Sequence, residues 1–534
     1  MERSLDWRPT GIELAVLTSG LTSMGLEILA GRLLAPEFGS SLYTWGSVIG
    51  VFLAALSLGY YRGGRRASDA TRSDLATLLL WSAGYVAFLL FAGDLVLRAS
   101  GSLPVPARFA PLFPVTILFG PPVYLLGFIS PYAAELSDRE TPGAASGHVY
   151  ALGTVGSIAG AFLTTFLLVP SLSVRNVGLL FGVVLVAASA GLSLPALTRE
   201  RLVRLGVVLL VLVGVVLTGP LGAAVTGETV YRTQTPYQSL AVVDDGDVRT
   251  LYLDGQPHSA MDLDDPDRHV FDYTRYFHLP LLMSEDVDRV LFVGGGGFTG
   301  PKHFARMGMT VDVAEIDPVV VRTAEEQFGV EESANLRIHT VGGRQFLQET
   351  NRTYDLIVLD AYKKDKVPFQ LTTVEFMRLA ESRLDDDGVL FANIISAPSG
   401  PASKFYRAEH KTMARVFPQI YTFPTAEGSV VQNVEVVATK RDERFTPAEL
   451  RRRNEARDIG IDLREEIEMY RPPPPTDDVP VLRDDRAPVD ALLDPMVGQR
   501  YVIQRTDTNG SETAARAVRP ADPRTLAAPV RRWS

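Results

Sequence analysis

The chain has 534 residues, with 62 Asp and Glu against 52 Lys and Arg, and it has no cysteine. Its formal net charge of −10 argues against a nucleic-acid partner, because phosphate backbones are bound by clusters of cations. The lack of cysteine excludes disulfides, thiolate catalysis and cysteine metal sites. Apolar residues concentrate before residue 227, so at least two unlike domains are expected.

Seven apolar segments are long enough to cross a hydrocarbon layer about 30 Å thick. The first segment carries Glu13 and Glu27 and runs on into further spans, so it does not resemble a cleavable signal peptide. The sequence therefore predicts an α-helical polytopic membrane domain over residues 1–227, with the lipid bilayer as its partner. The expected spans are 11–35, 41–61, 75–97, 109–135, 147–169, 174–197 and 203–224.

Basic residues in short loops predict the orientation of these spans. With the N-terminus inside, the inner loops hold ten arginines, whereas the outer loops before the last span hold only Arg98, Arg108 and Arg175. Seven spans would then deliver the C-terminal part outside, where a cytosolic nucleoside is absent. Either the Pro- and Gly-rich segment 109–135 does not cross fully, or the C-terminal part is extracytoplasmic. We favour the first alternative, with a cytoplasmic C-terminal part.

Ionisable residues inside the first span are candidates for function, because a charge in a bilayer is costly unless it is paired or faces a cavity. Glu27 and Arg32 lie five residues apart there, and Glu13 lies near the start of the span. A structural ion pair or an interfacial position is the alternative to a solute path. Gly153, Gly156 and Gly160 predict close packing between helices.

The C-terminal half changes to short strands and helices. Two antiparallel strands around Asp245-Gly246 indicate a small β domain over 228–285. Val/Ile/Leu-rich strands then alternate with helices over 286–440, which predicts a parallel sheet covered on both faces, an α/β Rossmann-like domain that binds a nucleoside. A helical and Pro-rich extension is expected over 441–505, and a disordered tail over 506–534.

A glycine run follows the first strand of the predicted sheet and opens a helix. Gly294, Gly295 and Gly296 stand where backbone can approach a nucleoside, and Glu315 ends the second strand 21 residues after Gly294. An acidic residue at that spacing holds ribose hydroxyls, whereas a solvated strand end is the alternative. NAD fits the same pattern, so the motif alone does not choose the cofactor.

Asp360 stands at the carboxyl end of the fourth strand, and Asp365 follows in a loop with Lys363, Lys364 and Lys366. That edge of a parallel sheet lines the ligand crevice. A carboxylate there can orient an amine or accept its proton. Capping of the loop backbone is the alternative role for Asp360.

Six pieces of sequence in this order resemble the spermidine synthase (polyamine aminopropyltransferase) family over roughly residues 229 to 400. They are TPYQSL, LYLDG, HLPL, VLFVGGGG, AEID and YDLIVLD. The segment GLEILAGRLLAPEFGSSLYTW is similar to the multi-span domain fused to such synthases in many prokaryotes, and APVDALL is similar to the closing segment of the family.

The resemblance implies transfer of an aminopropyl group from decarboxylated S-adenosylmethionine to a diamine or a related small-molecule amine. It implies no metal, and a homodimer is possible. The implied cofactor-binding residues are Gln238, Gly294, Gly295, Gly296, Glu315 and Gly343. The implied catalytic residues are Tyr237, Asp360 and Asp365.

Several positions differ from the family pattern and keep other functions open. The residues that depart are Gly297-Phe298, His258, Asp272-Tyr273, Gly343 and Ala361-Tyr362-Lys363. A methyltransferase that uses S-adenosylmethionine shares the sheet and Glu315. A transporter or sensor whose nucleoside-binding domain is not catalytic is the alternative from another class, and there Glu13, Glu27 and Arg32 would carry the function.

Overall fold

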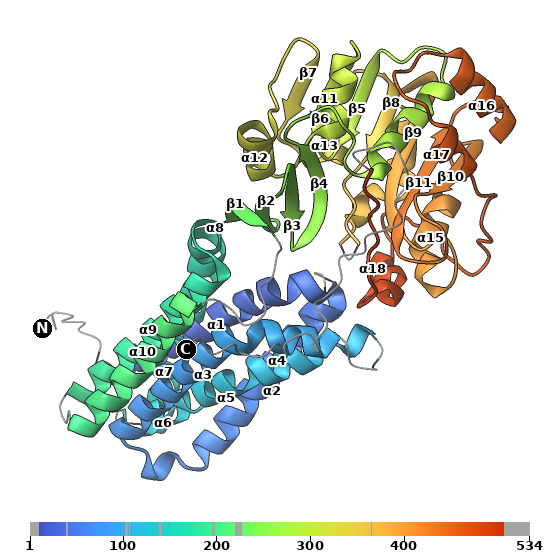
Figure 1. Ribbon diagram of the computed structural model, residues 1–534. Helices are drawn as coiled ribbons and strands as arrows, with labels where there is room; N and C mark the ends of the chain where they lie inside the picture. Colours follow the sequence, from blue (N-terminus) through green and yellow to red (C-terminus); the bar gives the residue numbers. More distant parts are fainter. Residues whose placement is uncertain are drawn as a thin grey trace, which may run out of the picture.

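The computed structural model describes residues 10–38, 41–101, 105, 107–137, 141–194, 198–218, 227–364 and 366–506. A long helical bundle is joined at one end to an α/β part, and the small sheet β1–β4 lies between the two (Figure 1). The predicted combination of an apolar helical region with a Rossmann-like sheet is confirmed. The expected disordered tail falls almost entirely on residues 507–534, which lie outside the described ranges.

The bundle contains ten helical segments and two short 3-10 turns among the described residues. They are α1 (Gly11–Phe38), α2 (Leu42–Gly64), η1 (Ala67–Asp69), α3 (Arg72–Gly101), η2 (Ala107–Phe109), α4 (Leu112–Leu118), α5 (Gly120–Gly127), α6 (Ile129–Glu135), α7 (Pro142–Leu163), α8 (Val169–Ser171), α9 (Val174–Ser193) and α10 (Arg199–Thr218). A single π-turn over Thr164–Leu168 joins α7 to α8.

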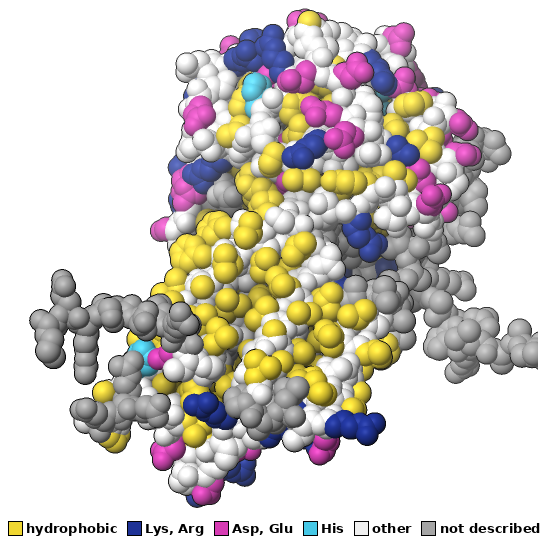
Figure 2. All heavy atoms as spheres, turned by 90° about the vertical axis from the view of Figure 1, so that its left-hand side faces the viewer, with side chains coloured by type: hydrophobic (Ala, Val, Ile, Leu, Met, Phe, Trp, Pro, Cys, Tyr) yellow, Lys and Arg dark blue, Asp and Glu magenta, His cyan; other side chains and the backbone are white. Residues whose placement is uncertain are grey.

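Five helical stretches of the described residues are long and apolar enough to cross a membrane, and a bent pair adds a sixth. About seven were expected. The seventh expected span, 203–224, begins in α10, but its residues 219–224 lie outside the described ranges. Apolar side chains cover the face of the bundle in Figure 2, as on a surface that contacts lipid. The chain is therefore a multi-pass membrane protein.

The segment 109–135 is broken as its Pro and Gly residues predict. Its two halves, Leu112–Leu118 and Gly120–Glu135, meet at 51°. The segment nevertheless runs from one end of the bundle to the other: η2 before it contacts η8 (Asp494–Met496) of the α/β part, and α6 at its end contacts η1 beyond the far end of α2. The expectation that this segment crosses incompletely is thus not met.

Glycines let α1 and α7 approach to backbone contact, as predicted from their spacing. A Cβ on Gly156 would lie 2.2 Å from the carbonyl oxygen of Leu17, and a Cβ on Gly160 would lie 2.3 Å from that of Leu21. Near the start of the same helix pair, the Glu13 carboxylate contacts His148 Nε2 at 2.6 Å. Small residues therefore set the distance between these two spans.

The α/β part contains two sheets. The antiparallel sheet β1 (Glu228–Gln234), β2 (Ser239–Asp245), β3 (Val248–Leu253) and β4 (Gln256–Asp262) includes the predicted turn at Asp245-Gly246. The second sheet has the order β10-β11-β9-β8-β5-β6-β7, in which β11 alone is antiparallel to the other strands. Its strands are β5 (Arg289–Val293), β6 (Thr310–Ala314), β7 (Leu336–His339), β8 (Tyr354–Leu359), β9 (Leu384–Ser396), β10 (Gln419–Pro424) and β11 (Gln432–Thr439).

Helices cover both faces of the larger sheet, as the continuous apolar strands require. One core joins the sheet to β2–β4, η5 (Asp272–Leu282), α11 (Thr299–Arg306), α12 (Pro318–Phe328), α16 (Pro447–Ala456) and α17 (Arg464–Glu468). The other core joins it to α13 (Gly343–Glu349), α14 (Val374–Glu381), α15 (Lys404–Met413) and α18 (Val489–Leu493). Short 3-10 turns lie at η6 (Phe369–Leu371) and η7 (Pro401–Ser403).

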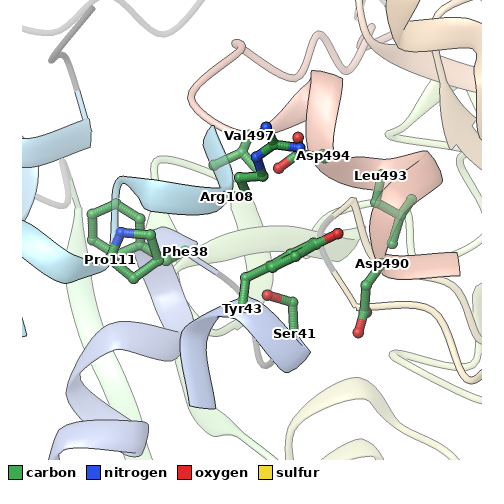
Figure 3. Close-up of a pocket in the computed structure, with 9 residues that line it drawn as sticks. All are labelled: Phe38, Ser41, Tyr43, Arg108, Pro111, Asp490, Leu493, Asp494 and Val497. Atoms are coloured by element: carbon green, nitrogen blue, oxygen red, sulfur yellow. The ribbon is translucent and has the colours of Figure 1, made fainter. Parts of the chain in front are cut away.

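The bundle meets the α/β part where α1 ends and α2 begins. The backbone N–H of Leu42 donates to Asp490 Oδ2 at 3.0 Å, and Arg108 lies beside Asp494 (Figure 3). Burial raises the pKa of Asp494, and the Arg108 guanidinium opposes that rise. A small pocket at this junction is lined by Phe38, Ser41, Tyr43, Arg108, Pro111, Asp490, Leu493, Asp494 and Val497.

Replacement of Gly156 by leucine should destabilise the bundle by about 1–3 kcal/mol, because the new side chain would overlap backbone that cannot move aside. The matched control is Gly147→Leu on the same helix, where an added Cβ meets nothing within 4 Å. Thermal unfolding of the detergent-solubilised chain measures both. Equal melting temperatures for the two variants would contradict the close α1–α7 contact.

Candidate functional site

The first strand of the parallel sheet ends in a turn that only glycine can form. Gly294 has a φ of +98°, and a Cβ there would lie 2.4 Å from the carbonyl oxygen of Asp360. Gly296 also has a positive φ, and Phe298, buried and left-handed, precedes α11. The turn therefore lies at the carboxyl edge of the sheet, where parallel sheets bind ligands, while its backbone N–H groups bond within the protein.

Glu315 follows β6 and lies against this turn. Its Oε2 accepts the N–H of Gly295 at 2.9 Å, and its Oε1 accepts the N–H of Asp317 at 2.8 Å. Burial raises the pKa of Glu315, while the backbone N–H groups oppose that rise. Three backbone N–H groups, those of Gly295, Gly296 and Asp317, bond a carboxylate that has about four acceptor sites, so about one site remains for a ligand hydroxyl. Glu315 is thus a fixed acceptor at the carboxyl edge of the sheet, whereas the alternative of a solvated strand end does not fit its burial.

The Tyr237-Gln238 pair lies at the same edge, but its two side chains differ in placement. Gln238 is buried, and its Nε2 donates to Asp317 Oδ2 at 3.4 Å. Tyr237 is 40 % exposed, and its backbone carbonyl accepts Lys366 Nζ at 3.1 Å. The structure therefore brings Gln238 toward Glu315 and leaves the Tyr237 ring at the rim.

Gly343 begins α13 and has no room for a side chain, because a Cβ there would lie 2.2 Å from Val293 Cγ1. Ile316, directly after Glu315, is instead 47 % exposed beside Gly342. The sequence analysis missed this apolar side chain. Its place in the sequence, between the strand-end acid Glu315 and the helix cap Asp317, is the signal that would have identified it.

Asp360 directly follows β8 and is half-buried beside the glycine turn. Its Oδ1 accepts Asn393 Nδ2 at 2.9 Å. Burial raises the pKa of Asp360 to about 7, the Asn393 hydrogen bond opposes that rise, and the charge of Glu315 adds to it. Asp360 therefore changes protonation near neutral pH and is suited to proton transfer. Asp365, the other carboxylate expected here, lies outside the described residues.

A chain of side-chain hydrogen bonds leads from Asp360 across the sheet. Asn393 Oδ1 accepts Asn433 Nδ2 at 2.7 Å, and Asn433 Oδ1 accepts the hydroxyl of Tyr501 at 2.6 Å. These residues come from β9, β11 and the C-terminal segment. The sequence analysis did not predict them, because residues that are distant in the chain meet only after β11 pairs with β9.

Glu435 is a buried acid near Asp360. It lies on β11 opposite Asn393, and neither of its carboxyl oxygens has a hydrogen-bond partner among the described residues. Burial, with the charges of Asp360 and Asp272, raises its pKa well above the ordinary value. Burial without a partner thus favours the protonated form of Glu435. A glutamate inside the apolar run of β11 was the only sequence signal for it.

The three lysines of the 360s loop are tied to other parts of the chain. Lys363 Nζ contacts Asp254 Oδ2 at 2.9 Å, Lys366 bonds Tyr237 as described above, and Lys364 contacts the Gln499 carbonyl. Asp254 belongs to the turn between β3 and β4. Burial and the nearby Lys363 lower the pKa of His258 to about 3, so His258 is neutral. The lysines thus fasten the loop to the small sheet.

The carboxyl edge of the sheet faces the bundle. Arg32, near the end of α1, donates to the carbonyl of Pro236 at 2.6 Å and is within electrostatic reach of Asp254 and Asp317. Arg32 therefore contacts the α/β part, a position that the sequence analysis did not consider. A residue of the first membrane helix touches the segment that precedes Tyr237 and Gln238.

Comparison with known proteins agrees with this architecture. A family profile described as "Spermine/spermidine synthase domain" matches residues 271–439. The "Polyamine aminopropyltransferase" of Vibrio vulnificus is 31 % identical over 210 residues, which cover 38 % of this chain and 69 % of that protein. "Polyamine aminopropyltransferase 2" of Ralstonia nicotianae is 25 % identical over 421 residues, which cover 73 % of this chain and 79 % of that protein.

The Ralstonia match covers more of this chain than the residues after 227 can supply, so it extends into the helical bundle. Among solved structures, a probable spermidine synthase from Corynebacterium glutamicum matches with a TM-score of 0.37 and 20 % identity, over 43 % of this chain and 87 % of that one. The identity and coverage of the Vibrio match establish that this chain belongs to the polyamine aminopropyltransferase family.

Proposed function

We propose that this protein is a membrane-bound transferase that moves the aminopropyl group of decarboxylated S-adenosylmethionine to a diamine or a related amine. The observation that carries the proposal is the meeting of the Gly294 turn, Glu315 and Asp360 at one edge of the sheet. The family supports the reaction class, and these carboxylates support the chemistry.

In this proposal Glu315 holds the ribose hydroxyls, and Gln238 and the glycine turn border the nucleoside. Ile316 offers an apolar surface to the adenine. The neutral amine attacks the methylene carbon beside the sulfonium, the C–S bond breaks with its electron pair passing to sulfur, and methylthioadenosine leaves. The carboxylate of Asp360 accepts the proton that the new ammonium loses. Positioning of the two reactants supplies much of the rate increase.

A non-catalytic nucleoside sensor or transporter is the second candidate. The observation that favours it is a set of three contacts on the side of the site where the amine would bind. Lys363 contacts Asp254, Lys366 contacts Tyr237, and Arg32 contacts Pro236, and together they close that side. In that case the crevice would report nucleoside binding to α1 through the segment before Tyr237. Turnover of the cofactor distinguishes the two candidates.

We further propose that the α/β part lies on the extracytoplasmic side. Exposed arginines gather where α2 ends and where α3 and α10 begin, at the end of the bundle away from the α/β part. Loops rich in arginine face the cytoplasm. With the bent segment running through the bundle, this favours the extracytoplasmic alternative over the cytoplasmic one that the sequence led us to prefer. A cytosolic nucleoside would then reach the site only across the bundle.

The Glu315→Ala variant should weaken binding of adenosyl ligands at least tenfold, because it removes a charged acceptor of hydrogen bonds from the crevice. Calorimetry of the full chain in detergent, with decarboxylated S-adenosylmethionine, S-adenosylmethionine, methylthioadenosine and NAD, measures this. Glu325→Ala on the exposed side of α12 is the control. Tight NAD binding, or equal affinities in both variants, would refute the assignment; preference for S-adenosylmethionine would point to methyl transfer.

The transfer rate should rise with pH and bend near pH 7, since Asp360 accepts a proton only when ionised and burial raises its pKa to about 7. Asp360→Asn should lower the rate about 10²–10⁴-fold and remove that bend. The measurement is the formation of methylthioadenosine across pH 5.5–9, with the exposed Asp386→Asn as control. A bend that survives in Asp360→Asn would exclude Asp360 as the proton acceptor.

The side of the membrane can be read with single cysteines, because the native chain has none. Glu326→Cys on α12 should react with a membrane-impermeant maleimide on intact cells, whereas Ser68→Cys beyond α2 should react only after the cells are broken. Both positions are exposed. The reverse pattern would place the α/β part in the cytoplasm.

A further inference from the structure

Three histidines meet behind the glycine turn, outside the site described above. His269 precedes η5, His278 lies within η5, and His303 lies in the last turn of α11. One ring nitrogen from each lies within 4.8 Å of the others, and the ring centroids are 4.8–5.2 Å apart. The family resemblance implied no metal, and nothing in the sequence grouped these three histidines.

The hydrogen bonds fix which nitrogens of His269 and His278 carry protons. The Thr274 hydroxyl donates to the carbonyl of Phe271 at 2.7 Å, so it accepts from His269 Nδ1 at 2.8 Å. His278 Nδ1 donates to the carbonyl of Arg275 at 3.0 Å. In both rings Nδ1 is therefore the protonated nitrogen, and Nε2 keeps a free lone pair.

Both Nε2 atoms are buried and have no hydrogen-bond partner among the described residues. A buried acceptor without a partner costs about 1–3 kcal/mol. Burial also lowers the pKa of His269 to about 3 and that of His278 well below its ordinary value, so protonation does not relieve this cost. Burial lowers the pKa of His303 as well. Three neutral imidazoles thus converge, two of them with unshared electron pairs.

We propose that His269, His278 and His303 bind a divalent transition-metal ion of the zinc class. Metal-bound histidines donate their second ring nitrogen to a carbonyl or another fixed group, which is the arrangement found for His269 and His278. Imidazole ligands alone select zinc, nickel, cobalt or copper over magnesium and calcium.

Closure of the site needs a small movement. Ligand nitrogens around tetrahedral zinc are about 3.4 Å apart, since each Zn–N bond is about 2.0–2.1 Å. His303 is the least buried of the three, so its side chain can move toward the other two. Its partial exposure also gives the ion a route from solvent. A fourth position remains for water.

The ion would connect α11 to η5. The helix α11 begins beside the glycine turn, and η5 contacts β9 and β11 and carries Tyr273. The hydroxyl of Tyr273 donates to the carbonyl of His258 at 2.8 Å, beside Ser259, whose hydroxyl accepts the N–H of Gly297 at 2.9 Å. The three histidines are therefore positioning residues, and the ion would fix the turn from the side opposite the crevice.

The test is the metal content of the full chain, purified in detergent through a tag without histidine. Elemental mass spectrometry should find about one zinc ion per chain. After chelation, added Co²⁺ should give the intense visible absorption of a tetrahedral site, and Zn²⁺ but not Mg²⁺ should raise the melting temperature. His303→Gln should lose bound metal and the cobalt spectrum.

His410→Gln is the matched control, since His410 is also buried with a partnerless Nε2 among the described residues but stands apart from the cluster. It should keep the metal. If His303→Gln does not fold, the uptake of zinc and cobalt by the chelated wild-type chain decides alone. No uptake of zinc or cobalt by the wild type, or equal uptake by His303→Gln, would overturn the proposal.

Discussion

The carboxylate of Asp317 holds together the parts that form the crevice. It is fully buried. Oδ1 caps α12 by accepting the N–H of Val319 at 3.0 Å, while Oδ2 accepts the Thr235 hydroxyl at 2.6 Å and the Gln238 amide. Its own N–H donates to Glu315. A buried carboxylate is tolerated only when its oxygens are satisfied, so the small sheet, α12 and Glu315 must adopt their positions together.

This constraint explains why the crevice carries so little free charge. Glu315 is satisfied by backbone N–H groups, Asp360 ionises only near pH 7, and burial raises the pKa of Glu435 well above its ordinary value. Lys363 is matched by Asp254. Burial thus removes most of the negative charge that would hold a doubly charged diamine. In the proposed reaction an acceptor with a neutral attacking amine, and few other cations, fits these groups best.

The sequence predicts the order of strands and helices well, because buried parallel strands are continuous apolar runs and the turns are marked by Gly, Asp and Pro. Gly294, Glu315 and Asp360 were found for the same reason, since each stands directly after such a strand. The acid Glu435 and the chain from Asp360 through Asn393 and Asn433 to Tyr501 could not be predicted. They depend on the pairing of β9 with β11, which no local pattern in the sequence records.

The bundle was predicted less completely for a different reason. Hydropathy depends only on the length and polarity of a segment. It therefore identified the Pro- and Gly-rich segment as a candidate span but could not predict the direction of the chain after the bend. The spacing of Glu27 and Arg32 in the sequence allowed a structural ion pair between their side chains. In the structure the Arg32 guanidinium bonds a carbonyl of the α/β part, a contact between residues about two hundred positions apart.

The contact of Arg32 with Pro236 also bears on how a ligand and the membrane helices affect each other. Pro236 lies between Thr235, which bonds Asp317, and Tyr237, which accepts Lys366. A nucleoside that engages Glu315 would therefore act on the same short segment that α1 touches. If nucleoside binding moves that segment, it also moves the end of α1. Because the coupling free energy between two sites is reciprocal, a movement of α1 changes the free energy of nucleoside binding by the same amount. In a membrane-bound transferase the same contact would let the membrane helices alter the affinity for the nucleoside.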